Sequence, residues 1–483
     1  MAFSSLSFLI FFLPVLLVLY YLIPRGTHRA RNALLLAAGL ALYAWAGVRF
    51  LPVLLSSAVL YWACGLAAAE GRPERLRRWA VPAAAVLGLG MLGYFKYTGF
   101  FAQILVSMGA GLTVPQIALP AGISFFTFKG ISYVADVRRG KIPAERGFFR
   151  VLFYVSLFPQ VLSGPIERYP ELAGELNGRE ETLERFSSGV VRFSAGLAKK
   201  AVLASAMGAV ADAVFKKPAA ALGAPVAWVG ALAYTAQIYF DFSGYSDMAI
   251  GVGRLFGFEF PENFRYPYAA ASVTDFWRRW HITLSSWFRD YVYIPLGGNR
   301  CSRLRNAFNI AAVWLLTGLW HGAAWTFIVW GLLNGAYQVF GALTLPARRS
   351  LRASLRIRED SRLTAVWQTL VTFLLTTAAW VFFRADSLPQ ALLVLRRVVT
   401  LAGGVFPLRF QALGMNRPAL IFTALSVLTL AALDRYGQDR LCLRLENTAW
   451  RRWAFCAGLV LLTLIFGAYG PGYNAQDFVY FKF

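Results

Sequence analysis

The sequence predicts an all-α protein, a polytopic bundle of transmembrane helices, and three observations support that prediction. The 483 residues are 58% hydrophobic and only 15% charged, whereas a soluble chain carries about 25% charged residues. Apolar windows of about 20 residues, each long enough to cross a hydrocarbon core of about 30 Å as a helix, recur along the whole chain. Basic residues gather in the short loops between those windows.

We expect about 10 to 14 transmembrane helices, because boundaries assigned from one sequence err by a few residues. No Lys or Arg precedes the first apolar window, so we expect it to be a retained membrane helix and not a cleaved signal peptide. No internal repeat divides the chain, which favours one domain over 1–483. In chain order, the windows are 5–23, 33–48, 51–69, 79–98, 120–137, 148–166, 188–215, 226–254, 307–325, 326–345, 364–384, 417–433 and 453–470.

The basic residues follow the positive-inside pattern of membrane proteins. The net charge of +24 therefore indicates membrane orientation and lipid contact, not a nucleic-acid partner. If the basic loops are cytoplasmic, both chain ends lie on the external face. The clusters are Arg25, Arg29 and Arg31; Arg72, Arg75, Arg77 and Arg78; Arg138, Arg139 and Lys141; Arg300, Arg303 and Arg305; Arg348, Arg349, Arg352, Arg356 and Arg358; and Arg451 with Arg452.

Two amphipathic segments interrupt the run of apolar windows. In 275–296, aromatic and aliphatic residues recur at helical spacing while the charges fall elsewhere, which predicts a helix that lies at the membrane interface or packs among other helices. Segment 388–401 is expected to be a second such helix, on the outer side.

His321 is a candidate catalytic residue because of its surroundings. Apart from it, only the weakly acidic Tyr337 is ionisable between Asn306 and Pro346. Basic clusters on both sides of this stretch predict that it crosses the membrane and returns, which places His321 well inside the membrane. A charged side chain is costly there, so we expect a neutral imidazole that acts either as a base or as a structural hydrogen-bond donor between helices.

Asp241, Ser243 and Asp247 interrupt the window 226–254. Carboxylates inside a membrane segment usually face a cavity or a polar partner. These residues are therefore expected to form a buried polar network, with either a structural or a catalytic role.

His281 lies beside Arg278 and Arg279 in the amphipathic segment. The two guanidinium groups suit the phosphates of a nucleotide-bearing acyl donor, although a basic face at the interface also serves to anchor a helix to lipid. His28, in the first basic loop, is expected to be a solvated loop residue.

The remaining polar features indicate no metal centre. The four cysteines are scattered without a close pair, and the three histidines are far apart in sequence, so neither a disulfide framework nor a metal site is predicted. SGPIERY, 163–169, by itself marks a loop. The terminal FVYFKF places Tyr480 in a segment typical of an interfacial aromatic anchor.

Four strings, taken in order, resemble the membrane-bound O-acyltransferase family: SGPIERY, DFSGYSDMAIG, DFWRRWHITLSSWFRDYVYIPLGGNR and GLWHGAAW. More narrowly, they resemble its bacterial branch that includes the membrane subunit of alginate O-acetylation. The amino-terminal FSSLSFLIFFLP and the terminal FVYFKF are also similar to that branch, so the resemblance covers nearly the whole chain.

The resemblance implies a ring of helices around a thinned centre, with a cytoplasmic funnel for the acyl donor, a central tunnel and an external opening. It implies that His321 is catalytic, that His281 occupies the second signature position, and that 118–402 forms the catalytic core. No tightly bound cofactor is implied. The expected acyl donor is acetyl-CoA.

The function implied is transfer of acetyl groups from a cytoplasmic donor across the bacterial inner membrane, for O-acetylation of an exopolysaccharide such as alginate. A separate extracytoplasmic acetyltransferase partner is expected to reach the polysaccharide acceptor. As a hypothesis, Tyr480 relays the acyl group, because a phenol is deprotonated more readily than a sugar alcohol; the alternative is the anchoring tail.

Two alternatives remain open at this stage. In the first alternative, the acceptor is peptidoglycan, cellulose or teichoic acid. The second belongs to another class: a proton-coupled transporter in which His321, Asp241 and Asp247 form a relay. A transporter does not require the arginine-rich and tryptophan-rich segment 275–296.

Overall fold

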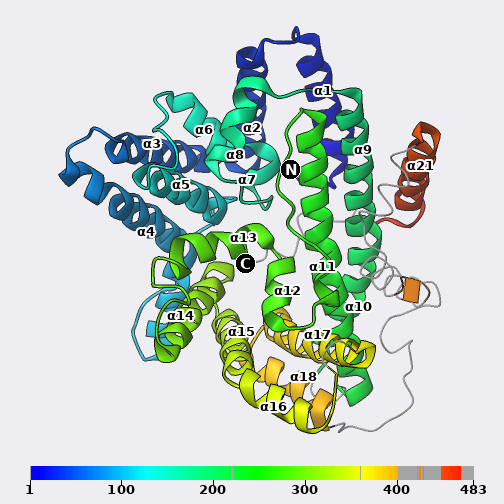
Figure 1. Ribbon diagram of the computed structural model, residues 1–483. Helices are drawn as coiled ribbons and strands as arrows, with labels where there is room; N and C mark the ends of the chain where they lie inside the picture. Colours follow the sequence, from blue (N-terminus) through cyan, green and yellow to red (C-terminus); the bar gives the residue numbers. More distant parts are fainter. Residues whose placement is uncertain are drawn as a thin grey trace. The chain divides into compact units, whose positions relative to one another are not determined.

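Helices account for nearly all of the regular structure in the computed structural model (Figure 1). It describes residues 2–218, 222–358, 361–400 and 448–468, together with the isolated positions 421, 424, 425 and 428. Within these ranges the β pairing is a single bridge between Phe264 and Trp280. The all-α class predicted from composition is therefore confirmed.

Four helical stretches in the described chain are long and apolar enough to cross a membrane, by length and composition. They are His28–Ala68, Glu74–Ser107, Trp325–Leu343 and Arg362–Arg384, and the shorter Ser7–Leu22 is also apolar. The other described helices are shorter, less apolar or more charged. The prediction of a membrane protein is confirmed. The four stretches in the described chain are fewer than the 10 to 14 crossing helices expected.

The chain divides into two compact units that interleave along the sequence. One contains the described residues of 1–193 and 245–262, and the other contains those of 194–244 and 263–468. Helices α9 and α11 each continue from one unit into the other.

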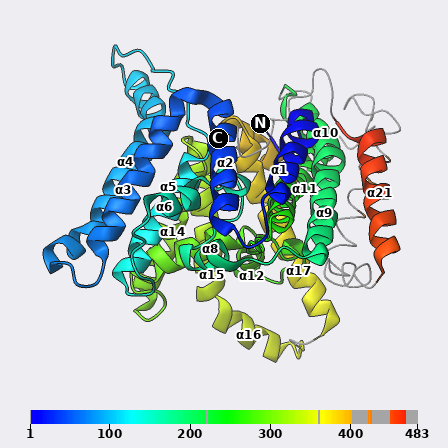
Figure 2. The same cartoon turned by 90° about the horizontal axis from the view of Figure 1, so that it is seen from above.

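The first unit begins with a π-helical turn, Ser7–Phe12, that leads into α1. Its further helices are α1 (Leu13–Leu22), α2 (His28–Gly47), α3 (Leu51–Ala68), α4 (Glu74–Ser107), α5 (Ile123–Arg138), α6 (Phe148–Ser156), α7 (Phe158–Val161), α8 (Tyr169–Gly178) and the start of α9 (Leu183–Ala198). Helices α3, α4 and α5 lie side by side, as both views show (Figures 1 and 2).

Tyr61 explains how α3, α4 and α5 approach so closely. Its ring is fully buried on α3. A Cβ atom at Gly88 of α4 or Gly130 of α5 would overlap that ring. Small residues at membrane helix contacts allow this kind of close packing, so two glycines and one tyrosine position three helices.

The second unit carries the helices that follow the π-helical turn Lys199–Ala204. They are α10 (Ser205–Phe215), α11 (Ala224–Leu255), α12 (Val273–Arg279), α13 (Ile282–Phe288), a π-helical turn Arg289–Tyr293, α14 (Arg303–His321), α15 (Trp325–Leu343), α16 (Leu345–Ser354), α17 (Arg362–Arg384), α18 (Leu388–Thr400) and α21 (Ala449–Phe466). The last residues of α11 belong to the first unit.

Most predicted windows coincide with observed helices, and two predictions are wrong. The window 148–166 is not one helix: α6 ends at Ser156 and the four-residue α7 follows. Pro159 lacks the N–H group that would continue α6, and its ring would clash with the preceding turn. The segment 275–296 is not one helix either, because the chain turns at His281. The window 417–433 lies almost entirely outside the described residues.

Candidate active site

A tight helical hairpin positions His321 in the second unit. His321 is the last residue of α14, the chain is extended at Gly322 and Ala324, and α15 begins at Trp325. The two helices pack with little space between their backbones: a Cβ atom at Gly318 would lie 2.5 Å from the Phe327 carbonyl oxygen. This close glycine packing fixes the position of His321 along the axis of the hairpin.

Aromatic rings enclose the His321 imidazole. Its centroid lies 4.9 Å from the ring of Trp320, 4.9 Å from that of Trp330 and 5.2 Å from that of Phe383. All three contacts are edge-to-face, with interplanar angles of 81°, 88° and 74°. His321 is only 4% exposed. Edge-to-face contacts on three sides restrict how the ring can rotate.

The rings beside His321 belong to a larger tryptophan cluster built from α12, α14, α15 and α17. Trp277 donates to Asn334 at 3.1 Å, which holds α12 against α15. The rings of Trp330 and Trp380 stack at 5.8 Å. Their buried Nε1 atoms have no hydrogen-bond partner in the part of the chain that the structure describes. An indole N–H can only donate, and the Trp330 ring lies next to His321.

His281 lies at the turn between α12 and α13, in the left-handed region with φ of 45°. This conformation breaks the helix that the sequence predicts over 275–296. The side chain is 1% exposed, and Nδ1 lies 3.1 Å from Oδ1 of Asn263. Phe242 contacts the imidazole edge-to-face, with centroids 4.6 Å apart.

Asn263 determines which nitrogen of His281 carries the proton. Its Oδ1 accepts from the backbone N–H of Thr283 at 3.3 Å and from the Thr283 hydroxyl at 3.0 Å. A carbonyl oxygen only accepts, so Nδ1 of His281 donates to it. In the neutral imidazole, Nε2 is then the nitrogen that can take a proton.

Trp320 connects the two histidines. Its ring lies 6.1 Å from His281 and 4.9 Å from His321, measured between centroids. The structure therefore brings the two sequence-predicted histidines, forty residues apart in the chain, to the same indole.

The two aspartates of α11 have different cationic partners. Asp241 accepts from Nζ of Lys200 at 2.5 Å, and both side chains are 5% exposed. Asp247, in the first unit, pairs with Arg192 at 2.6 Å, and Arg192 also binds Glu262 at 2.7 Å. Six residues on a helix separate the two side chains by about 120° around its axis, which agrees with this separate pairing.

Ser243 is also buried, two residues after Asp241. Its hydroxyl has no hydrogen-bond partner within the described ranges. Two residues on a helix point in nearly opposite directions, so Ser243 and Asp241 lie on different sides of α11.

Breaking the Lys200 and Asp241 pair is expected to destabilise the protein strongly. Lys200→Met leaves a carboxylate buried without its cation, and such a loss costs about 3–5 kcal/mol. The double variant Lys200→Met with Asp241→Leu removes both charges and should recover most of the loss. Denaturant-induced unfolding in mixed micelles measures both values, and equal destabilisation in the two variants would contradict this role.

The predicted donor-binding arginines end α12. Arg278 is exposed, and Arg279 pairs with Asp275 at 3.0 Å. The guanidinium of Arg278 is thus the more accessible of the two.

Tyr480, the residue of the acyl-relay hypothesis, lies outside the described residues.

Sequence reasoning missed several buried polar partners. In the SGPIERY string, Glu167 is fully buried and not simply part of a loop. It accepts from Gln160 at 2.7 Å, and Gln160 accepts from Lys129 at 2.6 Å. Lys129 and Lys200 could have been identified from the sequence, since each is a lysine inside an apolar window. Asn263 could not have been identified in this way, because its role depends on the fold of a distant loop.

Comparison with known proteins gives one consistent result. A sequence model of the membrane-bound O-acyltransferase family matches residues 143–385. A probable alginate O-acetylase of Azotobacter vinelandii is 43% identical over 401 residues, which cover 81% of this chain and 76% of the relative. A probable alginate O-acetylase of Pseudomonas putida is 38% identical over an alignment of 513 positions that covers 100% of both.

A peptidoglycan O-acetyltransferase of Helicobacter pylori is 36% identical over 434 residues, which cover 83% of this chain and 80% of the relative. The range matched by the family model includes His281, Asn263 and His321.

Proposed function

The chain belongs to the membrane-bound O-acyltransferase family, and from this premise we propose that it passes acetyl groups from cytoplasmic acetyl-CoA across the inner membrane for O-acetylation of an exopolysaccharide. The acyltransferase class and the membrane setting follow from the family. The acetyl group, the donor and the polymer belong to the proposal. The observation that carries it is the meeting of His281 and His321 at the ring of Trp320.

The chemistry that we propose is acyl transfer from a thioester to a hydroxyl. His321 takes the hydroxyl proton, the oxygen attacks the thioester carbonyl, a C–O bond forms, the C–S bond breaks, and the released thiolate takes up a proton. His281, held by Asn263, keeps Nε2 available as a proton acceptor beside the same indole. Aromatic walls that exclude water protect the thioester from hydrolysis.

The donor is proposed to enter through a cytoplasmic funnel and the acyl group to leave through a central tunnel, with both chain ends external. Arg278, which is exposed at the end of α12, suits the phosphates of the donor. An extracytoplasmic acetyltransferase partner is proposed to complete the transfer to the polymer. The expected catalytic core, 118–402, stays a prediction.

Proteoliposomes test the proposed activity. With acetyl-CoA on one side, the protein should release free thiol only when a hydroxyl acceptor is present. A proton-coupled transporter would instead acidify the vesicle lumen and leave the thioester intact. Acetyl-CoA that is not consumed, together with proton flux, would overturn the proposal.

A second acceptor, peptidoglycan, is favoured by the similarity to the Helicobacter pylori enzyme. Deletion of the gene separates the two cases. Loss of O-acetyl groups from secreted polysaccharide, with peptidoglycan unchanged, supports the proposal. The reverse result assigns the enzyme to the cell wall.

Tyr480 gives a separate prediction about the route of the acyl group. If its phenol relays acetyl, the intact protein exposed to acetyl-CoA should carry an acetyl adduct that the Tyr480→Phe protein lacks. Intact-mass spectrometry measures this difference directly. An adduct of equal abundance in both proteins, or none in either, ends the relay hypothesis and leaves the aromatic tail as an anchor.

A further inference from the structure

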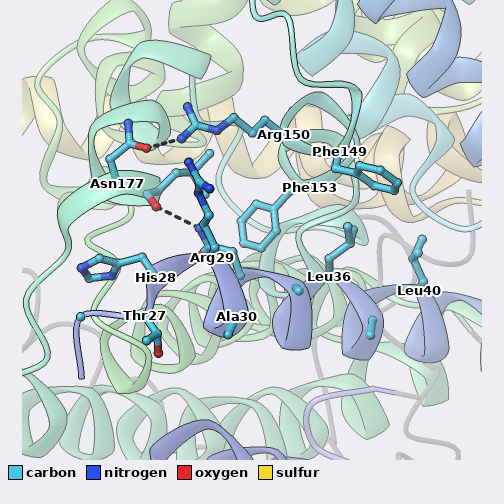
Figure 3. A pocket seen from close by; sticks show the side chains of 15 residues that line it. Thr27, His28, Arg29, Ala30, Leu36, Leu40, Phe149, Arg150, Phe153 and Asn177 are labelled. Atoms are coloured by element: carbon cyan, nitrogen blue, oxygen red, sulfur yellow. Dashed lines mark hydrogen bonds between the residues drawn. The ribbon is translucent and has the colours of Figure 1, made fainter. Parts of the chain in front are cut away.

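A cavity of about 1130 Å³ lies in the first unit, whereas the histidines of the candidate site belong to the second. Fifteen residues from α2, α6, α8 and the turn before α2 line it (Figure 3). All of them belong to one compact unit. His28 is among them: it begins α2 and is half-buried, which corrects the expectation of a solvated loop residue.

The lining is polar at one end and apolar at the other. Thr27, His28, Arg29 and Asn177 gather at the start of α2, whereas Leu36 and Leu40 follow further along it (Figure 3). From residue 28 to residue 40, α2 rises about 18 Å, more than half of a hydrocarbon core of about 30 Å. Phe149 and Phe153 of α6 complete the apolar end.

The polar end carries positive charge. None of the fifteen described residues that line the cavity is Asp or Glu. Helix α2 has no acidic residue in its first turn, and the Thr27 hydroxyl donates to the Pro24 carbonyl at 2.6 Å instead of capping the helix. The positive end of the helix dipole therefore adds to the charge of Arg29.

Arg29 has unused capacity for an anion. His28 lines the cavity beside it, although Nδ1 of its imidazole is shielded from solvent. Arg29 is exposed and makes no ion pair with any described carboxylate. Both side chains lie at the same end of the cavity (Figure 3).

Arg150 contributes less net charge than Arg29. It donates to Asn177 and lies 3.4 Å from Glu145. Burial would raise the pKa of Glu145, but hydrogen bonds from the Gly147 N–H and the Tyr169 hydroxyl, together with Arg150, hold that pKa below its usual value. Glu145 is therefore ionised at neutral pH and offsets part of the Arg150 charge.

We propose that this cavity is a binding site for an anionic glycerophospholipid. The phosphate lies against His28 and Arg29, and one acyl chain lies along Leu36, Leu40 and Phe149. The apolar end favours a lipid over a free anion, since an isolated phosphate would leave it unused. Helix α2 begins the stretch His28–Ala68, which is long and apolar enough to cross a membrane, and a basic end of such a stretch suits the level where anionic lipid headgroups reside.

Native mass spectrometry of the full-length protein tests the headgroup end. The protein in detergent is mixed with equal amounts of phosphatidylglycerol and phosphatidylcholine, and phosphatidylglycerol adducts should predominate. Arg29→Ala should weaken phosphatidylglycerol binding about fivefold, the effect of removing one cation at a membrane surface. Arg25→Ala is the matched control, because Arg25 is an exposed arginine in the turn just before α2 and does not line the cavity.

A second pair of variants tests the apolar end. Ala37 lines the cavity, whereas Ala41, one turn further along α2, does not. Ala37→Trp should fill the groove and displace the lipid, and Ala41→Trp should leave binding unchanged. Equal binding of both lipids, unaffected by Arg29→Ala and Ala37→Trp, would overturn the proposal. Displacement of the adduct by inorganic phosphate alone would also overturn it, since that result assigns a simple anion site.

Discussion

Replacing His321 with alanine is expected to lower the rate of acetyl transfer by about 10²- to 10⁴-fold, the range that a positioned acid–base group contributes. The imidazole is held by Trp320, Trp330 and Phe383 in a site that is 4% exposed. His281, the other histidine at the ring of Trp320, stays in place in this variant. The measurement is thiol release from acetyl-CoA by purified protein with a hydroxyl acceptor.

The matched control for this variant is Thr317→Val, one turn earlier on α14. The Thr317 hydroxyl bonds only within its own helix in the described structure, to the Val313 carbonyl at 2.8 Å. The valine side chain has nearly the same shape, so the variant should keep both its activity and its melting temperature. His321→Ala should melt within a few degrees of the parent. Wild-type turnover by the His321→Ala protein would refute its assignment as the catalytic base.

Replacing Asn263 with leucine is expected to reduce both activity and stability. One carbonyl oxygen accepts from His281 and twice from Thr283. Leucine leaves these buried donors unpaired, at a cost of roughly 1–3 kcal/mol for each. It also removes the contact that fixes the proton on Nδ1 of His281. Steady-state kinetics and denaturant-induced unfolding measure the two effects.

Asn263→Asp distinguishes a positioning role from a purely structural one. The carboxylate still accepts from the same donors, so most of the stability should be kept. Its charge stabilises the protonated imidazole of His281, which delays formation of the neutral base until higher pH. The acid limb of the pH–rate profile should therefore shift to higher pH. An unshifted profile would show that Asn263 supports the fold alone.

The sequence was sufficient to predict the fold class, because composition and apolar length depend on no tertiary detail. Helices α11, α14, α15 and α17 lie where the apolar windows predict them. The failures were local. Pro159 interrupts an apolar window without changing its hydropathy. At His281 the apolar residues keep helical spacing on both sides of the break, so periodicity cannot reveal it.

The candidate site was predictable only in part, for the same reason. His321 and His281 were identified as unusual polar residues in recognisable strings, and the structure brings both to Trp320. Their supporting residues come from elsewhere in the chain. Asn263 precedes His281 by eighteen residues and Lys200 precedes Asp241 by forty-one. Pairings at such separations follow from helix packing, which one sequence does not specify.

The backbone at position 281 has a consequence for engineering. A residue with a Cβ atom in the left-handed region costs about 1–2 kcal/mol, and His281 occupies it with φ of 45°. Glycine adopts that conformation without this penalty. The same substitution would also empty a buried ring position and remove the hydrogen bond to Asn263, losses that outweigh the strain relieved. A screen that selects variants for heat resistance alone would therefore keep a large side chain at this turn in spite of its backbone strain.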